Sequence, residues 1–252
     1  MILILARLLK ELCDLVYPPY PKCPACGQEY QPLEINLCTD CITRINFIEE
    51  DYCSKCGKMV GVSTELCFDC REYERFFTTA RAVGVYEKGL KDYIKLFKYQ
   101  KQRQLAEPLA ELMAIYVERF YQLSEIDYIT YIPVHQSRLR ERGFNQAYLL
   151  AKRIADSLHL GIAKLLKRKR ATVKQSKLGN LARRKNLRGE FKLLNQAKII
   201  NSKLLMVDDI YTTGTTVNEA SNILLSAGAA QVKIITLATG KDLDLNKEND
   251  EL

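Results

Sequence analysis

The sequence predicts an α/β fold, in which a parallel sheet is covered by helices and is preceded by a small cysteine-rich module. Three observations predict it. Cysteine pairs are concentrated within residues 21–72. From about Tyr73 onward, short apolar segments alternate with amphipathic ones, which is the pattern of strands joined by crossover helices. A strongly apolar strand then leads into an acidic turn rich in threonine, within residues 204–220.

The N-terminal segment, residues 1–20, is predicted to be an amphipathic helix that ends at Pro18-Pro19. Its apolar run is six residues long before Arg7 interrupts it, far below the roughly 20 residues that cross a bilayer. We expect this helix to cover a neighbouring domain, with Cys13 as a small buried side chain. At the other end, residues 241–252 are polar and predict a disordered tail.

Eight of the nine cysteines form four CxxC pairs, arranged as two similar halves. Such an arrangement favours two tandem zinc ribbons over redox dithiols, and thiolate ligands indicate a reducing, cytoplasmic compartment. Spacing alone allows either sequential or alternating pairs to share a metal. The simpler, sequential assignment gives one structural zinc site to Cys23, Cys26, Cys38 and Cys41, and the other to Cys53, Cys56, Cys67 and Cys70.

The remaining chain, residues 73–240, is predicted to form the α/β domain. Apolar segments bounded by turn residues predict strands, and apolar spacing of three and four predicts helices between them. Strands separated by helices indicate a parallel sheet covered on both faces. Strands are expected at residues 80–86, 127–133, 203–209 and 231–238, and helices within residues 90–120, 145–158 and 215–227.

The most informative segment follows the strand at 203–209. Asp208 and Asp209 end this strand, at the edge where open parallel sheets bind ligands. Gly214 lets the backbone turn into a helix, whose N-terminal N–H groups and dipole favour a phosphate. Two carboxylates beside a phosphate fit a ligand that also brings hydroxyls or a magnesium ion. Further hydroxyl donors come from the turn Thr212, Thr213, Gly214, Thr215 and Thr216.

This strand, acid pair and Thr/Gly turn resemble the fingerprint of phosphoribosyltransferases. The resemblance implies that Asp208 and Asp209 are the catalytic pair, holding the ribose hydroxyls, and that residues 212–216 cradle the 5-phosphate. It also implies that phosphoribosyl pyrophosphate binds together with Mg²⁺. No GxxxxGK[ST] stretch occurs in the sequence, which disfavours a P-loop ATPase or helicase.

A cationic cluster follows the second predicted strand, at the same sheet edge as Asp208. It contains His135, Arg138, Arg140 and Arg142. Guanidinium groups bind diphosphates through forked donors, so we interpret the cluster as a diphosphate site. Taken alone, the same residues are equally typical of a solvated helix face.

Positive charge is concentrated between Lys164 and Lys192, where twelve Lys or Arg face the single acid Glu190. This segment favours a polyanionic partner, with a solvated basic surface as the plain alternative. Phe144, Tyr148 or Phe191 could stack on bases nearby. The candidate nucleic-acid contacts are Lys167, Arg168, Lys169, Arg170, Lys174, Arg183 and Arg184.

Taken in order, the motifs resemble the ComF family of competence proteins over nearly the whole chain, from Cys23 to about Thr239. After the CxxC pairs come HxxRLRxRGFNQ at 135–146, RxRATxxQ at 168–175, RRxNLRGEF at 183–191 and VDDIYTTGTT at 207–216. The resemblance implies that 135–146 is the family signature beside the pyrophosphate loop, and that 168–191 is a mobile loop. It further implies a role in DNA uptake, near a membrane channel and a DNA-translocating helicase, at the inner face of the membrane.

Two functional hypotheses remain open on the sequence. The first is a competence protein that handles incoming single-stranded DNA and keeps a pocket for phosphoribosyl pyrophosphate. The alternative is a metabolic phosphoribosyltransferase acting on an unidentified acceptor. No motif in the sequence identifies a purine or pyrimidine pocket, so the first hypothesis is preferred.

Overall fold

The computed structural model describes residues 20–31, 34–100, 102–169 and 189–242. Several predictions fall outside these residues: the N-terminal helix with Cys13, the basic residues Arg170, Lys174, Arg183 and Arg184, and the tail beyond Asp242. Within the described ranges, no helix is both long enough and apolar enough to cross a membrane.

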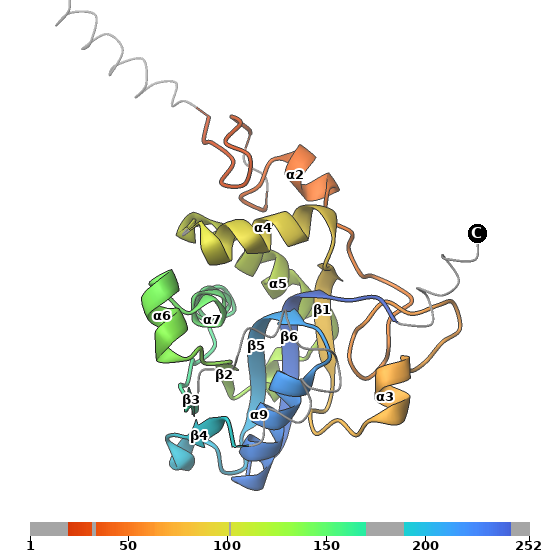
Figure 1. Ribbon diagram of the computed structural model, residues 1–252, viewed down its shortest axis with the longest axis vertical. Coiled ribbons are helices and arrows are strands. Elements are labelled where there is room, and N and C mark those ends of the chain that lie inside the picture. Colours follow the sequence, from red (N-terminus) through yellow and green to blue (C-terminus); the bar gives the residue numbers. More distant parts are fainter. Residues whose placement is uncertain (1–19, 32–33, 101, 170–188, 243–252) are drawn as a thin grey trace, which may run out of the picture.

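The predicted alternation of strands and helices is confirmed (Figure 1). The main sheet contains β1 (Ala80–Val85), β2 (Tyr128–Tyr131), β5 (Lys203–Tyr211) and β6 (Gln231–Thr239). The helices are α2 (Thr39–Thr43), α3 (Phe68–Glu72), α4 (Lys88–Tyr99), α5 (Ala106–Phe120), α6 (Gln136–Arg142), α7 (Gln146–Ser157) and α9 (Thr215–Ser226). Short 3₁₀ turns lie at Arg103–Leu105, Leu123–Glu125 and Gln196–Lys198.

The helices predicted within 90–120 are confirmed as two, α4 and α5, because the chain leaves α4 at Gln100 and re-enters a helix only after a 3₁₀ turn. The sequence does not predict the small antiparallel hairpin of β3 (Leu166–Arg168) and β4 (Phe191–Leu193). Strands of three residues are too short to show an alternating pattern.

The main sheet is parallel throughout, in the order β1-β6-β5-β2. Successive residues of a strand face opposite sides. Leu204 and Met206 of β5 accordingly pack in the core that includes α9, whereas Leu205 and Val207 pack in the core that includes α4, α5 and α7. The expected cover on both faces is confirmed. Because the strands run in one direction, their carboxyl ends share one edge.

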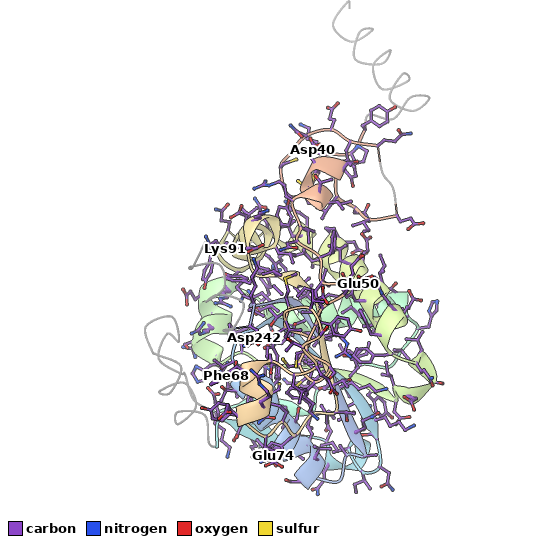
Figure 2. All side chains as sticks on the ribbon, turned by 90° about the vertical axis from the view of Figure 1, so that its right-hand side faces the viewer. Asp40, Glu50, Phe68, Glu74, Lys91 and Asp242 are labelled. Atoms are coloured by element: carbon purple, nitrogen blue, oxygen red, sulfur yellow. The ribbon has the colours of Figure 1, made fainter. Side chains whose placement is uncertain are left out.

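The two cysteine-rich halves pack against different parts of the α/β domain, with α2 above α4 and α3 beside β1 (Figure 1). In the first half, the carbonyl oxygen of Cys41 accepts a hydrogen bond of 2.9 Å from the hydroxyl of Tyr93 in α4. In the second half, the backbone N–H of Phe68 donates to the Asp242 carboxylate at 3.1 Å, which places the two residues side by side (Figure 2).

Each half brings its four cysteine sulfurs together, with all Sγ atoms within 4.8 Å of one another. The sets are the sequential ones, and not alternating pairs. The Sγ atoms of Cys23 and Cys41 are 3.8 Å apart, and those of Cys56 and Cys67 are 3.5 Å apart. Zn–S bonds of about 2.3 Å in a tetrahedron give sulfurs about 3.8 Å apart. Both clusters therefore fit structural zinc.

The chain that follows the second half also supports α9. The side-chain oxygen of Asn218 accepts from the backbone N–H of Phe76 at 2.7 Å, and its amide nitrogen donates to the carbonyl of Glu74 at 3.2 Å. Next to this contact, the Tyr211 ring packs edge-on against Phe77, with centroids 6.2 Å apart. The chain that leaves the second cluster is thus hydrogen-bonded to the first turns of α9.

We predict that Asn218→Ala lowers the free energy of unfolding by about 1–2 kcal/mol, because it leaves the Phe76 N–H and the Glu74 carbonyl without their partner. Urea denaturation measures this loss. Asn222→Ala, on the same helix, is the control and should cost less. An Asn218→Ala variant as stable as the wild type would contradict the proposed support of α9.

We also predict that the purified chain carries two zinc ions, one for each cluster. Their removal by a strong chelator should lower the unfolding temperature by roughly 10 °C or more, since zinc binding is coupled to folding. Elemental analysis gives the stoichiometry, and calorimetry with and without restored zinc gives the shift. A protein that contains no zinc, or one that loses it without a change in unfolding temperature, would contradict this prediction.

Candidate functional site

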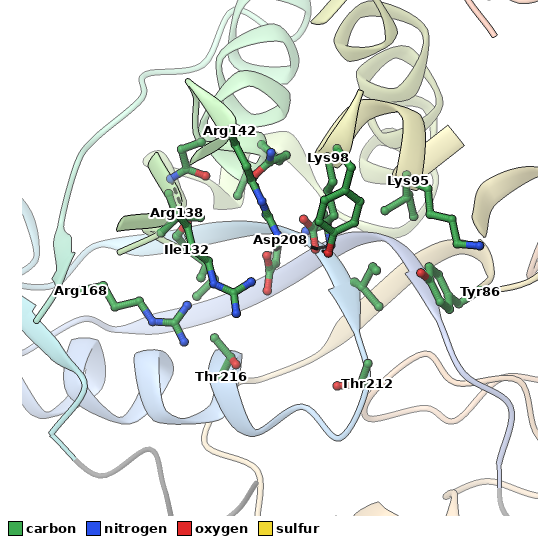
Figure 3. A pocket seen from close by; sticks show the side chains of 18 residues that line it. Tyr86, Lys95, Lys98, Ile132, Arg138, Arg142, Arg168, Asp208, Thr212 and Thr216 are labelled. Atoms are coloured by element: carbon green, nitrogen blue, oxygen red, sulfur yellow. Dashed lines mark hydrogen bonds and ion pairs between the residues drawn. The ribbon is translucent and has the colours of Figure 1, made fainter. Parts of the chain in front are cut away.

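A cavity of about 310 Å³ lies at the carboxyl edge of the sheet, between α4, α6, the β3–β4 hairpin and the start of α9. In Figure 3, Arg138 and Arg168 lie on one side, Tyr86 and Lys95 on the other, and Asp208 between them. Its charged lining residues are Lys95, Lys98, Arg138, Arg142, Arg168, Asp208 and Asp209. The lining is thus rich in cations around two neighbouring carboxylates.

The two carboxylates stand where β5 emerges from the buried part of the sheet. Asp208 Oδ1 accepts a hydrogen bond from the backbone N–H of Asp209 at 2.9 Å. Burial, and then the charge of Asp209, raise the pKa of Asp208 to about 7. Asp209 is compensated by Lys98, whose Nζ lies 2.8 Å from Asp209 Oδ1. The pair therefore contains one carboxylate neutralised by an ammonium group and one that takes up a proton near neutral pH.

The turn after the acid pair has the geometry expected from its glycine. Gly214 is in the left-handed region, with φ of 72°, and forms the N-cap of α9. A Cβ at this position would collide with the Tyr211 hydroxyl, so that both the backbone conformation and the space require glycine. Thr212 and Thr216 line the cavity. The hydroxyls of Thr213 and Thr215 are 2.7 Å apart and hydrogen-bond to each other.

The cationic cluster of α6 is only partly at the cavity. Arg138 and Arg142 line it. Arg142 is buried, donates to the Gln146 side-chain oxygen at 3.1 Å, and lies over the Tyr99 ring at 5.1 Å. His135 is instead the N-cap of α6, where its Nδ1 accepts from the backbone N–H of Ser137 at 3.2 Å. It is absent from the residues that line the cavity.

The candidate DNA contacts that the structure describes also divide into residues at the cavity and residues away from it. Lys167 and Lys169 are exposed. Arg168 folds back to line the cavity, where its Nε donates to Glu190 Oε1 at 2.8 Å. Of the aromatic candidates for base stacking, Phe144 and Phe191 are buried, at 6% and 4% exposure, whereas Tyr148 is 39% exposed.

The sequence analysis missed the contribution of α4, which supplies Lys95, Lys98 and Tyr99 to the cavity. A signal was present, since Lys95 and Lys98 are three residues apart on an amphipathic helix and therefore share a face. Lysines on the polar face of a helix are commonly solvated, however, and only the fold places this helix over Asp208 and Asp209.

Among the residues that the structure describes, the cysteine clusters are the only places where three or more potential metal ligands meet. The acid pair offers two carboxylates, and one of them is bound to Lys98. The cavity's own donor set therefore does not form a protein cage for a divalent cation.

Comparison with protein families identifies both parts of the chain. A double zinc ribbon domain matches residues 12–71, and a phosphoribosyl transferase domain matches residues 144–251. The second match contains the acid pair, the threonine turn and α9.

Comparison with curated proteins gives relatives along most of the chain. Competence protein F of Haemophilus influenzae is 29% identical over 222 residues, which cover 86% of this chain and 96% of the relative. Competence protein ComFC of Streptococcus pneumoniae is 28% identical, covering 86% and 99%. The DNA utilization protein YhgH of Escherichia coli O157:H7 is 30% identical, covering 79% and 88%. With both domains present and these relatives matched over most of their length, the chain belongs to the ComF family of competence proteins.

Proposed function

We propose that the cavity binds phosphoribosyl pyrophosphate, or a similar phosphorylated ribose, and that the protein handles single-stranded DNA during natural transformation. The observation that supports the ligand best is the meeting of an acid pair with cations and a helix N-terminus in one cavity. A purely anionic ligand would be repelled by the carboxylates of Asp208 and Asp209. A ribose phosphate has both hydroxyls that donate and phosphates that accept.

Each part of this ligand has a matching group. Ribose hydroxyls would donate to Asp208 and Asp209, and the 5-phosphate would accept from backbone N–H groups and hydroxyls at 212–216. The diphosphate would lie near Arg138 and Arg142, whose forked donors suit phosphate oxygens. We expect the diphosphate to bring Mg²⁺ with it, since phosphate oxygens are ligands that this cation prefers.

The DNA part of the proposal draws on the relatives and on the charge of the chain. The relatives are called competence proteins and a DNA utilization protein. In this chain, the exposed Lys167 and Lys169 flank the cavity residue Arg168. A strand of DNA held by this basic hairpin would lie at the rim of the ribose-phosphate cavity, so the two ligands would influence each other. Such binding would take place in the cytoplasm.

The alternative, a metabolic phosphoribosyltransferase, is favoured by the same cavity. In that reaction the bond between C1 of the ribose and the diphosphate breaks and an acceptor takes the ribosyl group. Asp208 and Asp209 would hold the ribose in place, while Arg138 and Arg142 would stabilise the charge on the leaving diphosphate.

We predict that the protein binds a labelled single-stranded oligonucleotide with an affinity that falls steeply as salt rises, by a logarithmic slope of about −0.7 for each phosphate contact. Replacing Lys167 and Lys169 by Ala should weaken binding and make the slope shallower by about 1.4. Lys152→Ala, an exposed site on α7, is the control. The titrations are repeated with phosphoribosyl pyrophosphate and Mg²⁺, which we expect to change the DNA affinity.

An oligonucleotide affinity that changes neither with salt concentration nor with the double substitution would overturn the DNA part of the proposal. If phosphoribosyl pyrophosphate still bound, the result would favour the metabolic transferase, and release of pyrophosphate in the presence of candidate acceptors would be measured next.

We further predict that Asp208→Asn stabilises the protein above neutral pH. The folded-state pKa of Asp208, about 7, lies above the usual value of about 3.9. The folded protein therefore keeps a proton that the unfolded chain releases, and this contribution to stability, complete below about pH 4, is lost as pH rises through about 7. An asparagine side chain needs no proton.

The Asp208→Asn substitution is expected to raise the free energy of unfolding by about 2 kcal/mol at about pH 8, with the gain shrinking towards pH 4. Partial exposure of Asp208 keeps this below the full effect of the pKa shift. Thermal unfolding across this pH range measures it, with Asp156→Asn as an exposed control. Identical pH profiles for Asp208→Asn and wild type would contradict the prediction. The same variant should also bind phosphoribosyl pyrophosphate more weakly.

A further inference from the structure

We propose that Lys98 is the built-in counter-ion of the acid pair, so that this pair binds ribose hydroxyls without a divalent cation and Mg²⁺ acts only on the diphosphate. The inference rests on the proposed ribose-phosphate function and adds a residue to it. It implies that α4 helps to determine which part of the ligand, the ribose or the diphosphate, needs a metal ion for binding.

The position of Lys98 carries the inference. Its Nζ lies 2.8 Å from Asp209 Oδ1, and the two side chains are only 13% and 15% exposed. In Figure 3 it approaches the acid pair from the helix above the sheet edge. A pair this sheltered from water is weakly screened, and its geometry is that of a charge-assisted hydrogen bond.

The rest of α4 holds Lys98 in place. Ile94 and Phe97 of the same helix are completely buried. The Phe97 ring also contacts Phe144, with centroids 5.4 Å apart. This face of α4 is fixed against the core, so Lys98 approaches the acid pair from a rigid element. Its long side chain therefore does not have to be brought into place from a freely moving position in solvent.

The acid pair in turn is a poor site for Mg²⁺. That cation needs close to six oxygen ligands at about 2.0–2.1 Å in octahedral geometry. Here Oδ1 of Asp209 is bound to an ammonium group and Oδ1 of Asp208 to a backbone N–H. A divalent cation at this point would also be repelled by Lys98 and by the nearby Arg168, which lines the same cavity.

Neutralisation of the acid pair's charge by Lys98 and neutralisation by a metal ion predict different ligand binding. With Lys98 on one oxygen of Asp209, other oxygens of the pair remain available to accept from ribose hydroxyls, and the negative charge of Asp209 is already balanced. A ribose phosphate that lacks the diphosphate should then bind equally well with and without Mg²⁺. The complete diphosphate should still bind more tightly when Mg²⁺ is present.

The test measures ribose 5-phosphate binding by calorimetry, using the full-length, zinc-loaded protein with and without excess Mg²⁺. No chelator is added, because it would attack the cysteine clusters. For the wild type we expect affinities that agree within about twofold. Lys98→Met should lose about tenfold or more without Mg²⁺, because the anionic ribose 5-phosphate then meets the uncompensated charge of Asp209, and should recover in part when Mg²⁺ is added.

Two further variants serve as controls for Lys98→Met. Lys98→Arg keeps the positive charge and should retain most of the affinity without Mg²⁺. Lys91→Met, at an exposed position of the same helix, should behave as the wild type. Thermal unfolding of each variant checks that it is folded.

The proposal is overturned if wild-type binding of ribose 5-phosphate requires Mg²⁺, a result that needs no variant, or if folded Lys98→Met binds as the wild type does without Mg²⁺. In both cases the proposed ribose-phosphate function would survive. If the wild type bound neither ribose 5-phosphate nor phosphoribosyl pyrophosphate under any condition, the proposed function itself would fail, and the role of Lys98 with it.

Discussion

Asp208 and Asp209 are neighbours in the chain at the end of β5, and their charges must be balanced inside a sheltered site. Lys98 of α4 balances one of them, and a raised pKa relieves the other. The surrounding elements take their positions from this constraint. α4 covers the sheet edge where the pair emerges, and α6 and the β3–β4 hairpin add the arginines that complete a cationic rim.

The second cysteine cluster is connected to this site through short contacts. The backbone between the cluster and β1 is hydrogen-bonded to Asn218 of α9, and Tyr211 fills the space beside Phe77 and beneath Gly214. The turn of residues 212–216 thus lies between the acid pair on one side and the cysteine-rich segment on the other. The rigidity of that turn depends on packing against the segment of chain that leads out of the second cysteine cluster.

The parts of the site that are contiguous in the chain could be predicted from the sequence. The strand, the acid pair and the glycine turn follow one another, and each residue type has a local physical reason. Cysteine spacing likewise predicted both clusters. Lys98 could not be found in this way, because its role depends on which helix covers the sheet edge.

Arg168 and His135 show the same limit of sequence prediction, since the first lies at the cavity and the second lies away from it. Arg168 belongs to a basic run that is predicted to bind a polyanion, yet its side chain pairs with Glu190 across the hairpin and lines the cavity. His135 belongs to the predicted diphosphate cluster, and the structure places it at the N-cap of α6, outside the residues that line the cavity. Charge and spacing do not reveal which partner a side chain will meet, since that partner comes from a distant part of the chain.

The distribution of the cysteines between the two apolar cores has a consequence for how this architecture can change over time. Cys38 and Cys41 belong to the core with α4 and α5, whereas Cys53, Cys56 and Cys67 belong to the core with α9. A chain that began at Tyr73 would leave two bare apolar surfaces, one on each side of the sheet. A change that removed the cysteine-rich segment alone would therefore expose both cores, and such a chain would need new apolar contacts on both sides of the sheet to stay folded.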